Sequence, residues 1–356
     1  ALSMALLALT GVFAQSLGNI ARIDLGLDVD SVVMLTISPE ASGYAPAASA
    51  TLIDRLEQEL AAIPGVASAS SAMVAMLAGG GLETGAAAEG NDERIGVHLN
   101  GVSDDFFEAL GISVLAGRQF RAGDRDRAQA VVIVNQRLAE RLRPDGGVIG
   151  QQLRVLGGDR EIVGVVADVR DNNVTDEVEP QVFLPRRQSA TLGSATFFVR
   201  GARAPEQLIG SIRDTVTRLA PTVPVTEFRT MRQQVRENLA TERFVAGAAT
   251  AFAVLASALA GLGLYGVLPY SVAQRSREIA LRYALGAPAA RIRVMVLRQV
   301  GAMALTGLVL GVVAALLLGR AARSLLFGVD AADPAALLGA AVVLGAVMLG
   351  AAYLPA

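Results

Sequence analysis

The sequence predicts a membrane protein with an α-helical transmembrane domain of four helices and an α+β domain outside the cytoplasm. Apolar residues make up 53% of the chain. Stretches of about 20 apolar residues are long enough to cross a hydrocarbon core of roughly 30 Å. Four stretches of that length carry no charged residue, whereas the block between the first two holds most of the acids. The uncharged stretches are residues 1–21, 244–270, 299–319 and 335–356.

An arginine-rich loop between the second and third stretches sets the orientation. Residues 271–299 hold six arginines and a single acid. Cytoplasmic loops of membrane proteins carry an excess of basic residues, so this loop is predicted to be cytoplasmic and residues 22–243 extracytoplasmic. We therefore expect a multi-pass protein of the cell (inner) membrane. Its helices are predicted at 1–21, about 244–268, about 294–319 and about 335–356, with the cytoplasmic loop at 271–293.

The extracytoplasmic block, 22–243, has similar patterns at its two ends. Each end shows a β-rich run, then apolar residues at helical spacing, then a second β-rich run. Two such units predict a ferredoxin-like split βαβ layer. The insertion between them, about 76–190, predicts a second, strand-rich subdomain that begins with a small, flexible stretch at 78–90. The predicted strands of the layer are 31–38, 66–73, 195–200 and 223–228, and its helices are 48–63 and 205–219.

A single long helix is predicted to follow this layer. Thr230 and Gln233 have the spacing of a capping box, and neither proline nor glycine occurs again until Gly247. A helix over 231–268 would extend for about 57 Å at 1.5 Å per residue. That exceeds the bilayer thickness, and the excess is predicted to form a stalk that couples the outer domain rigidly to the membrane.

The glycines of the membrane stretches are predicted to serve helix packing. Gly261, Gly263 and Gly266 match G-x-G-x-x-G, but a dinucleotide fingerprint needs a preceding strand and an acid downstream. Here the glycines lie inside an uncharged membrane stretch. Small residues let membrane helices approach closely, and Gly307 and Gly311 on the third helix have the same interpretation. The alternative is the ordinary glycine richness of membrane helices.

The composition of the chain argues against several kinds of catalytic chemistry. The chain has no cysteine, and all 31 of its basic residues are arginine, so thiolate and lysine chemistry are excluded. His98 is the only histidine and is interpreted as an ordinary strand residue. We predict no catalytic, cofactor-binding or metal-binding residues and no enzyme activity.

The distribution of charge excludes further classes of protein. The membrane stretches contain no Asp, Glu or His, which argues against an ion-coupled carrier. The outer block has a net charge of −7 and the remainder +5. An acidic soluble domain of this kind argues against nucleic-acid binding.

Within the basic loop, residues 275–285 predict a short helix. Glu278 and Arg282 form an i,i+4 pair, Ile279 and Tyr283 share one face, and Gly286 suits the position after a helix end. Two interpretations remain. The helix rests on anionic headgroups, or it docks on a cytoplasmic partner.

Several short motifs occur in order along nearly the whole chain. In the membrane domain they include GLYGV at 263–267, in the second apolar stretch, and REIALR at 277–282 and ALGA at 284–287, in the basic loop. Those in the outer block include PGV at 64–66, VSDDFF at 102–107, EIVGVV at 161–166 and VFLP at 182–185. With these motifs the sequence resembles the ABC-transporter permeases of the MacB/FtsX type.

The resemblance implies four transmembrane helices, a MacB-like core domain outside, and an FtsX-like membrane domain over 244–356. It also implies a coupling helix that docks on a cytoplasmic ABC ATPase, so that ATP is bound by a separate subunit. A second permease unit, as a homodimer or an internal duplicate, and an extracytoplasmic adaptor or substrate are further expected partners. The coupling residues it implies are Arg275, Arg277, Glu278, Ile279, Arg282 and Gly286.

The chain also departs from this family. It lacks the ATPase domain that MacB carries, and the closest match is to permeases with two such units in one polypeptide. The chain begins at Ala1 without a basic leader, so its first helix is expected to be part of a longer one.

The predicted function is that of a permease subunit that couples ATP hydrolysis to motion of the outer domain, with export as the expected direction. The alternative is a non-transporting membrane sensor or scaffold that regulates an extracytoplasmic partner. A membrane-anchored enzyme would require a carboxylate site in the outer domain.

Overall fold

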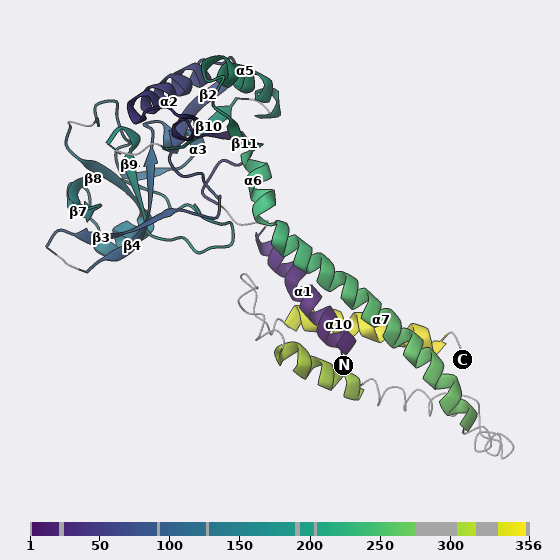
Figure 1. The fold of residues 1–356 in the computed structure, drawn as a ribbon. Coiled ribbons are helices and arrows are strands. Elements are labelled where there is room, and N and C mark those ends of the chain that lie inside the picture. The colour runs from purple at the N-terminus through teal and green to yellow at the C-terminus, as the bar shows by residue number, and fades with distance from the viewer. Residues whose placement is uncertain are drawn as a thin grey trace. The chain divides into compact units, whose positions relative to one another are not determined.

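The computed structural model describes residues 2–20, 25–90, 93–125, 128–188, 193–202, 205–274, 305–317 and 334–353. The chain divides into two compact units. One is the outer unit, Asp24–Leu239, and the other is the membrane unit, formed by Ala1–Ile23 and Ala240–Ala356. The elements of both units are labelled in Figure 1.

The outer unit is built on one 11-stranded sheet whose strands pair in the order β11-β1-β10-β2-β4-β3-β7-β8-β6-β9, with β5 paired to β8. The strands are β1 (Val32–Ile37), β2 (Val66–Ala72), β3 (Leu82–Ala88), β4 (Ile95–Val102), β5 (Val114–Gly117), β6 (Val131–Asn135), β7 (Gln152–Val155), β8 (Gly158–Val166), β9 (Gln181–Pro185), β10 (Ala195–Gly201) and β11 (Val225–Thr230). The helices are α2 (Pro46–Ala61), α3 (Phe106–Leu110), α4 (Gln136–Leu142), α5 (Ile209–Leu219) and α6 (Met231–Asn238), with short 3-10 helices η1 (Glu40–Ser42), η2 (Arg186–Gln188) and η3 (Pro205–Gln207).

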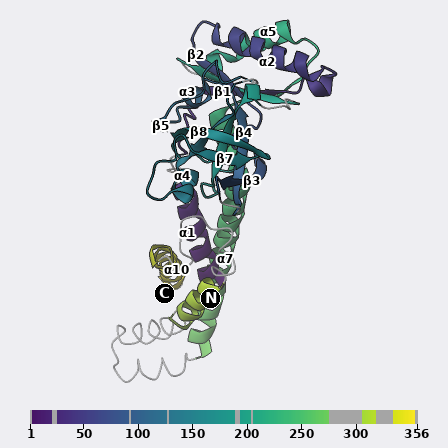
Figure 2. The same cartoon turned by 90° about the vertical axis from the view of Figure 1, so that its left-hand side faces the viewer.

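The first part of the sheet is an antiparallel layer of β11, β1, β10 and β2. Helices α2 and α5 lie side by side over it, as Figure 2 shows. Alternate residues of β1, among them Val33 and Leu35, meet Leu56 and Leu60 of α2 in one buried core. The strands and both helices overlap the segments predicted for the split βαβ layer, although α5 begins at Ile209, after the separate 3-10 helix η3, and not at residue 205.

The second part of the sheet closes on itself. Strands β4, β3, β7, β8, β6 and β9 pair in sequence, and β9 also pairs with β4 in parallel. The six strands therefore form a ring, whose buried core includes Leu99, Val134, Leu153 and Val182. Strand β3 corrects a prediction, because a flexible stretch was expected over 78–90. Its weak β propensity is overridden by pairing on both edges, with β4 and β7.

An aromatic cluster joins the two parts of the sheet. Phe106 and Phe107 of α3 are both fully buried. The Phe107 ring lies 5.1 Å from Phe183 of β9, and the Phe106 ring lies 5.8 Å from Phe198 of β10. Aromatic pairs at such spacing contribute beyond their buried area, so this cluster is an apolar connection between the layer and the ring.

The long helix predicted over 231–268 is interrupted. Helix α6 ends at Asn238, and Leu239 follows as its cap with φ −90° and ψ 7°, while α7 runs from Ala240 to Gln274. No proline or glycine marks this position, but Leu239 is buried, with 5% of its surface exposed. The break falls on the boundary between the two units, so the prediction of one uninterrupted stalk helix is wrong.

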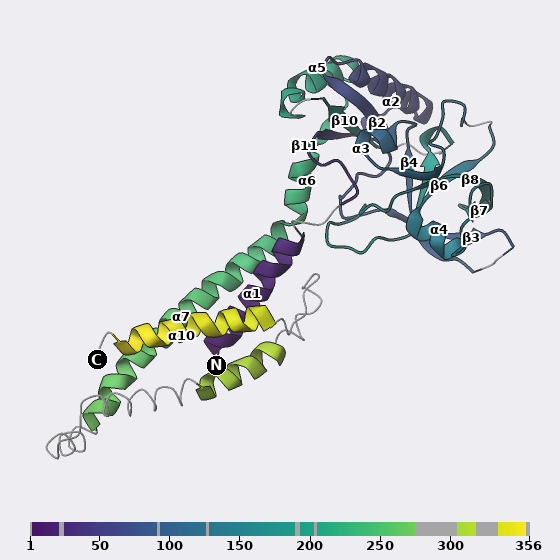
Figure 3. The ribbon, with the colours of Figure 1, turned by 180° about the vertical axis from the view of Figure 1, so that it is seen from behind.

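The membrane unit contains α1 (Leu2–Ile20), α7 (Ala240–Gln274), helical residues Leu305–Leu317 and α10 (Pro334–Tyr353); Figure 3 shows α1, α7 and α10 from behind. Small residues dominate its core, which includes Ala5, Ala8, Ala315 and Ala340. Among the described residues, one helical segment, Arg243–Gly263, is long and apolar enough to cross a membrane. The other three apolar helices are shorter in the described residues, so a four-helix crossing stays a prediction.

Candidate functional site

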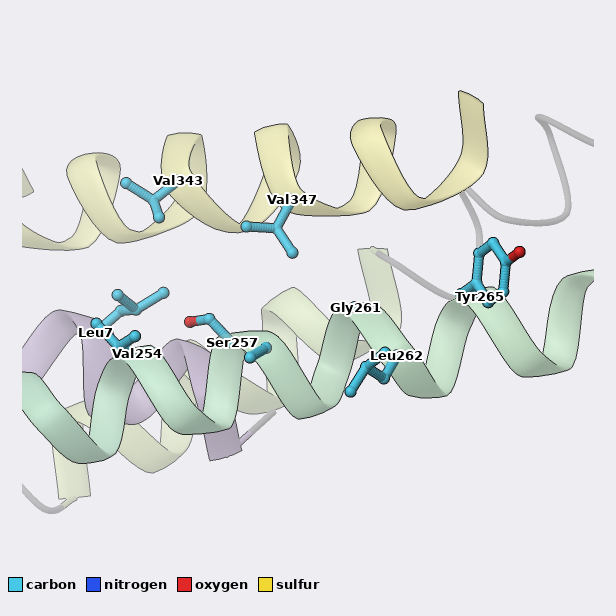
Figure 4. A pocket seen from close by; sticks show the side chains of 9 residues that line it. Leu7, Val254, Ser257, Gly261, Leu262, Tyr265, Val343 and Val347 are labelled. Carbon is cyan, nitrogen blue, oxygen red and sulfur yellow. The ribbon is translucent and has the colours of Figure 1, made fainter. Parts of the chain in front are cut away.

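A groove of about 520 Å³ lies between helices of the membrane unit. Its wall is apolar except for Ser257 and Tyr265, and the Ser257 hydroxyl donates to the carbonyl of Ala253 within its own helix. Such a wall can accommodate hydrocarbon and contains no carboxylate, histidine or basic side chain. Figure 4 shows that α1, α7 and α10 all contribute to it. The lining residues are Leu7, Val254, Ser257, Ala258, Gly261, Leu262, Tyr265, Val343 and Val347.

The predicted packing glycines fall in different surroundings. A methyl group added at Gly261 would lie 3.4 Å from Val347 Cγ1, so α7 and α10 approach closely there. One added at Gly263 or Gly266 would meet nothing within 4 Å in the described part of the chain. Gly307 is half-buried and Gly311 is buried. A role of these glycines in helix association stays a prediction.

The predicted coupling residues lie outside the described residues, which end at Gln274 on α7 and resume at Leu305. Their role in docking an ATPase therefore also stays a prediction. These residues are Arg275, Arg277, Glu278, Ile279, Arg282 and Gly286.

Helix α6, the last element of the outer unit, is held by side-chain hydrogen bonds that we call the α6 clamp. Gln234 Nε2 and Asn238 Nδ2 both donate to the carbonyl of Leu77, each at 2.5 Å. Asn238 Oδ1 accepts from the backbone N–H of Val174 at 3.3 Å. The clamp thus joins α6 to the loops that follow β2 and β8.

Leu77 is in an unusual conformation at the centre of this clamp. Its φ is +57°, in the left-handed region that non-glycine residues rarely adopt, and its side chain is fully buried. Its N–H donates to the carbonyl of Asp171 at 2.6 Å. A strained backbone of this kind costs on the order of 1–3 kcal/mol and persists only where its surroundings hold it. Here both backbone polar groups of Leu77 are held by other segments.

His98 has surroundings that the sequence did not predict. It lies on β4, as expected, but it is 7% exposed and faces carboxylates. Its Nδ1 lies 2.9 Å from Asp171 Oδ2, and its Nε2 lies 3.2 Å from Glu179 Oε2 and 3.6 Å from Glu83 Oε1. The interpretation of an ordinary strand residue is therefore incomplete. The local sequence contains no signal for these contacts, because the strand β3 that places Glu83 opposite His98 was not predicted.

A second polar cluster connects α2 to η2. Glu57 accepts a hydrogen bond from the Ser71 hydroxyl at 2.6 Å and lies 3.7 Å from Arg186. Burial raises the pKa of Glu57, and the hydrogen bond and the arginine charge offset only part of that effect. Asp54 pairs with Arg186 and Arg187. Ser71 and Arg186 are both buried, so this cluster serves as an internal link between the layer and the ring.

Comparison with known families identifies the chain. The MacB-like periplasmic core domain matches residues 1–256, and the FtsX-like permease C-terminal domain matches residues 250–356. The chain belongs to the MacB/FtsX-type permeases of ABC transporters. It is accordingly an inner-membrane protein with an extracytoplasmic domain.

Individual relatives of this permease are distant. It is 26% identical to the probable export ATP-binding/permease protein MacB of Pseudomonas entomophila, over 61% of this chain and 33% of that protein. It is also 26% identical to the macrolide export ATP-binding/permease protein MacB 1/2 of Paracoccus denitrificans, over 72% of this chain and 40% of that protein. The chain thus spans two fifths or less of the length of these two relatives.

A solved structure shows a weaker likeness. The periplasmic region of MacB from Actinobacillus actinomycetemcomitans aligns with a TM-score of 0.41 at 10% identity, over 62% of this chain and 97% of that chain.

Proposed function

We propose that this permease is one subunit of an ABC-type export system. A separate cytoplasmic ATPase binds and hydrolyses ATP, and the permease transmits the resulting motion to the outer unit. The chain itself performs no catalysis and binds no cofactor. It works with a second permease unit, either another copy or a duplicate in the same polypeptide, and with an adaptor or substrate outside the cytoplasm. In this proposal all four helices cross the membrane.

One observation carries the proposal: a single residue, Leu239, separates the clamped helix α6 from the membrane helix α7. Leu239 is buried, and Asn238 beside it is bonded to Leu77 and Val174. A displacement of α7 along its axis therefore has a short covalent path into hydrogen-bonded segments of the outer unit. The apolar membrane groove, whose lining contains no acidic, basic or histidine residue, supports a part that moves rather than one that conducts ions.

The proposal is tested by purifying the full-length protein from native membranes beside a variant in which Arg277, Glu278 and Arg282 are all changed to Ala. That variant loses one unit of positive charge. The matched control is Arg291→Ala, which loses the same charge from the same loop but outside the predicted coupling helix. Bound proteins are identified by mass spectrometry, and ATP hydrolysis by each purified sample is measured.

We expect an ABC ATPase, and its ATP hydrolysis, with the parent and the control but not with the triple variant. Retention by the triple variant would refute the assigned coupling residues. Absence of an ATPase from all three samples would remove the energy source and favour the sensor or scaffold alternative.

A further inference from the structure

We propose that His98 is a proton-operated latch that sets how firmly the α6 clamp is held. When its imidazole is charged, it binds the segment 171–179 to the β3–β4 hairpin. When the imidazole is neutral, that segment loosens, and the hold on Leu77 and α6 loosens with it. The consequence for transport rests on the proposed function, whereas the latch itself is measurable without an ATPase.

The observed geometry requires a proton on each ring nitrogen of His98. Both ring nitrogens of His98 face carboxylate oxygens, at 2.9 Å for Asp171 and 3.2 Å for Glu179. A neutral imidazole has one N–H, and its other nitrogen is an acceptor. With ionised carboxylates, a neutral ring would place one lone pair against another acceptor. Only the imidazolium donates at both positions.

Acidic groups surround this ring from two elements. Carboxylates face it from β3, through Glu83, and from the segment between β8 and β9, through Asp171 and Glu179. Asp171 is 23% exposed, whereas Glu179 and Glu83 are 57% and 79% exposed. Loss of the proton would leave three like charges converging on a neutral side chain. Because Glu83 and Glu179 reach into solvent, they can move away, and the contact opens.

A path of hydrogen bonds connects this cluster to α6. The side chain of Asp171 contacts His98, and its backbone carbonyl accepts the N–H of Leu77. The carbonyl of Leu77 in turn accepts from Gln234 and Asn238. A shift of Asp171 therefore reaches α6 through one residue, Leu77, whose strained backbone depends on these bonds.

The fixed and movable sides of the latch are distinct. The backbone N–H of His98 donates to the carbonyl of Pro180 at 2.8 Å, and β4 pairs with both β3 and β9. The ring is therefore anchored in the sheet. The segment 171–179, which precedes Pro180 in the chain, lies outside the strands. Histidine is the side chain whose ordinary titration falls between pH 5 and 8. The outer unit lies outside the cytoplasm, so it is exposed to changes in external pH.

One feature of the sequence makes the test specific. His98 is the only histidine, so in a protein purified without a histidine tag, a ¹³Cε1-histidine label gives one NMR signal to follow. The full chain is placed in lipid nanodiscs with a chelator present. Amide hydrogen exchange of residues 75–80, 171–179 and 231–239 is then compared at pH 5.5 and pH 7.5, after correction for the intrinsic pH dependence of exchange.

We expect exchange in all three segments to be at least about tenfold slower at pH 5.5, with a midpoint that coincides with the NMR titration of His98. In His98→Gln this difference should fall to less than twofold. Glu179→Gln removes one partner on the surface and should reduce the difference. Glu177→Gln, an exposed acid in the same segment, is the matched control and should leave it unchanged.

The proposal is overturned if His98 titrates while the amides of the three segments exchange equally fast at both pH values. It is also overturned if Glu179→Gln and Glu177→Gln have equal effects. Far-UV circular dichroism establishes that each variant is folded, and Glu179→Gln provides the test if His98→Gln is not. None of these measurements requires an ATPase, so they can refute the latch without refuting the proposed transport function.

Discussion

Removing the side chains of the α6 clamp should release the end of the outer unit without unfolding it. Asn238→Ala abolishes two hydrogen bonds, one donated to Leu77 and one accepted from Val174. The carbonyl of Leu77 then still accepts from Gln234. In the double variant with Gln234→Ala, α6 offers no side-chain donor to that carbonyl.

The size of the effect follows from the bonds that are lost. A hydrogen bond contributes about 0.5–1.5 kcal/mol net, and a buried polar group left unpaired costs about 1–3 kcal/mol. Asn238→Ala should therefore lower the free energy of local opening by about 2 kcal/mol. Since about 1.4 kcal/mol corresponds to a factor of ten, exchange should accelerate about thirtyfold. The double variant leaves the carbonyl of the buried Leu77 unpaired and should lose about 3–5 kcal/mol.

Amide hydrogen exchange of residues 75–80 and 231–239, followed by mass spectrometry, measures this opening directly. Arg236→Ala is the matched control, because Arg236 is exposed on the same helix. Arginine and alanine both have high helix propensity. The reasoning is refuted if Asn238→Ala accelerates exchange less than about threefold. It is equally refuted if Arg236→Ala has the same effect as Asn238→Ala.

Three other predictions concern the core, the buried carboxyl and the membrane helices. Phe107→Ala should lower the free energy of unfolding of the outer unit by about 3–5 kcal/mol, measured by urea titration and circular dichroism. The control is Leu115→Ala, at an exposed position. A loss below about 1 kcal/mol for Phe107→Ala would contradict the packing argument. Because burial raises the pKa of Glu57, its contribution to stability is complete below the unfolded-state pKa of about 4.3 and is lost as the pH rises through the folded-state pKa. Glu57→Gln should therefore gain stability relative to the parent as the pH rises, and a pH-independent difference between the two would count against this assignment. Gly261→Leu should destabilise the membrane unit by about 1–3 kcal/mol through overpacking, whereas Gly263→Leu should not. The measurement is thermal melting of both variants in detergent. Equal shifts of the melting temperature in the two variants would contradict the close approach of α7 and α10.

Much of the outer layer was predictable because its signals are local. The apolar spacing of α2 and α5 follows from one face of each helix packing against strands. Proline and glycine mark where α2 stops, at residues 64–65. The strand β3 had no such signal, because its sequence, LETGAAA, forms a strand through pairing with β4 and β7.

The polar sites could not be predicted for a related reason. His98 and Asp171 are 73 positions apart, and Leu77 and Asn238 are 161 apart. No periodicity or spacing links residues at such separations, since sheet closure and loop packing bring them together. The break at Leu239 also lacks a local signal, because neither proline nor glycine marks it in the sequence.

The sequence by itself determined the apolar stretches, the orientation expected from the arginine loop, and the family. These depend on length, charge and short motifs, which are properties of adjacent residues. Tertiary structure alone decided that the inserted strands close into a ring, that α6 and α7 are separate helices, and that His98 faces three carboxylates. Those features depend on contacts between distant segments, where hydrogen bonding and burial select one arrangement from many that the local sequence permits.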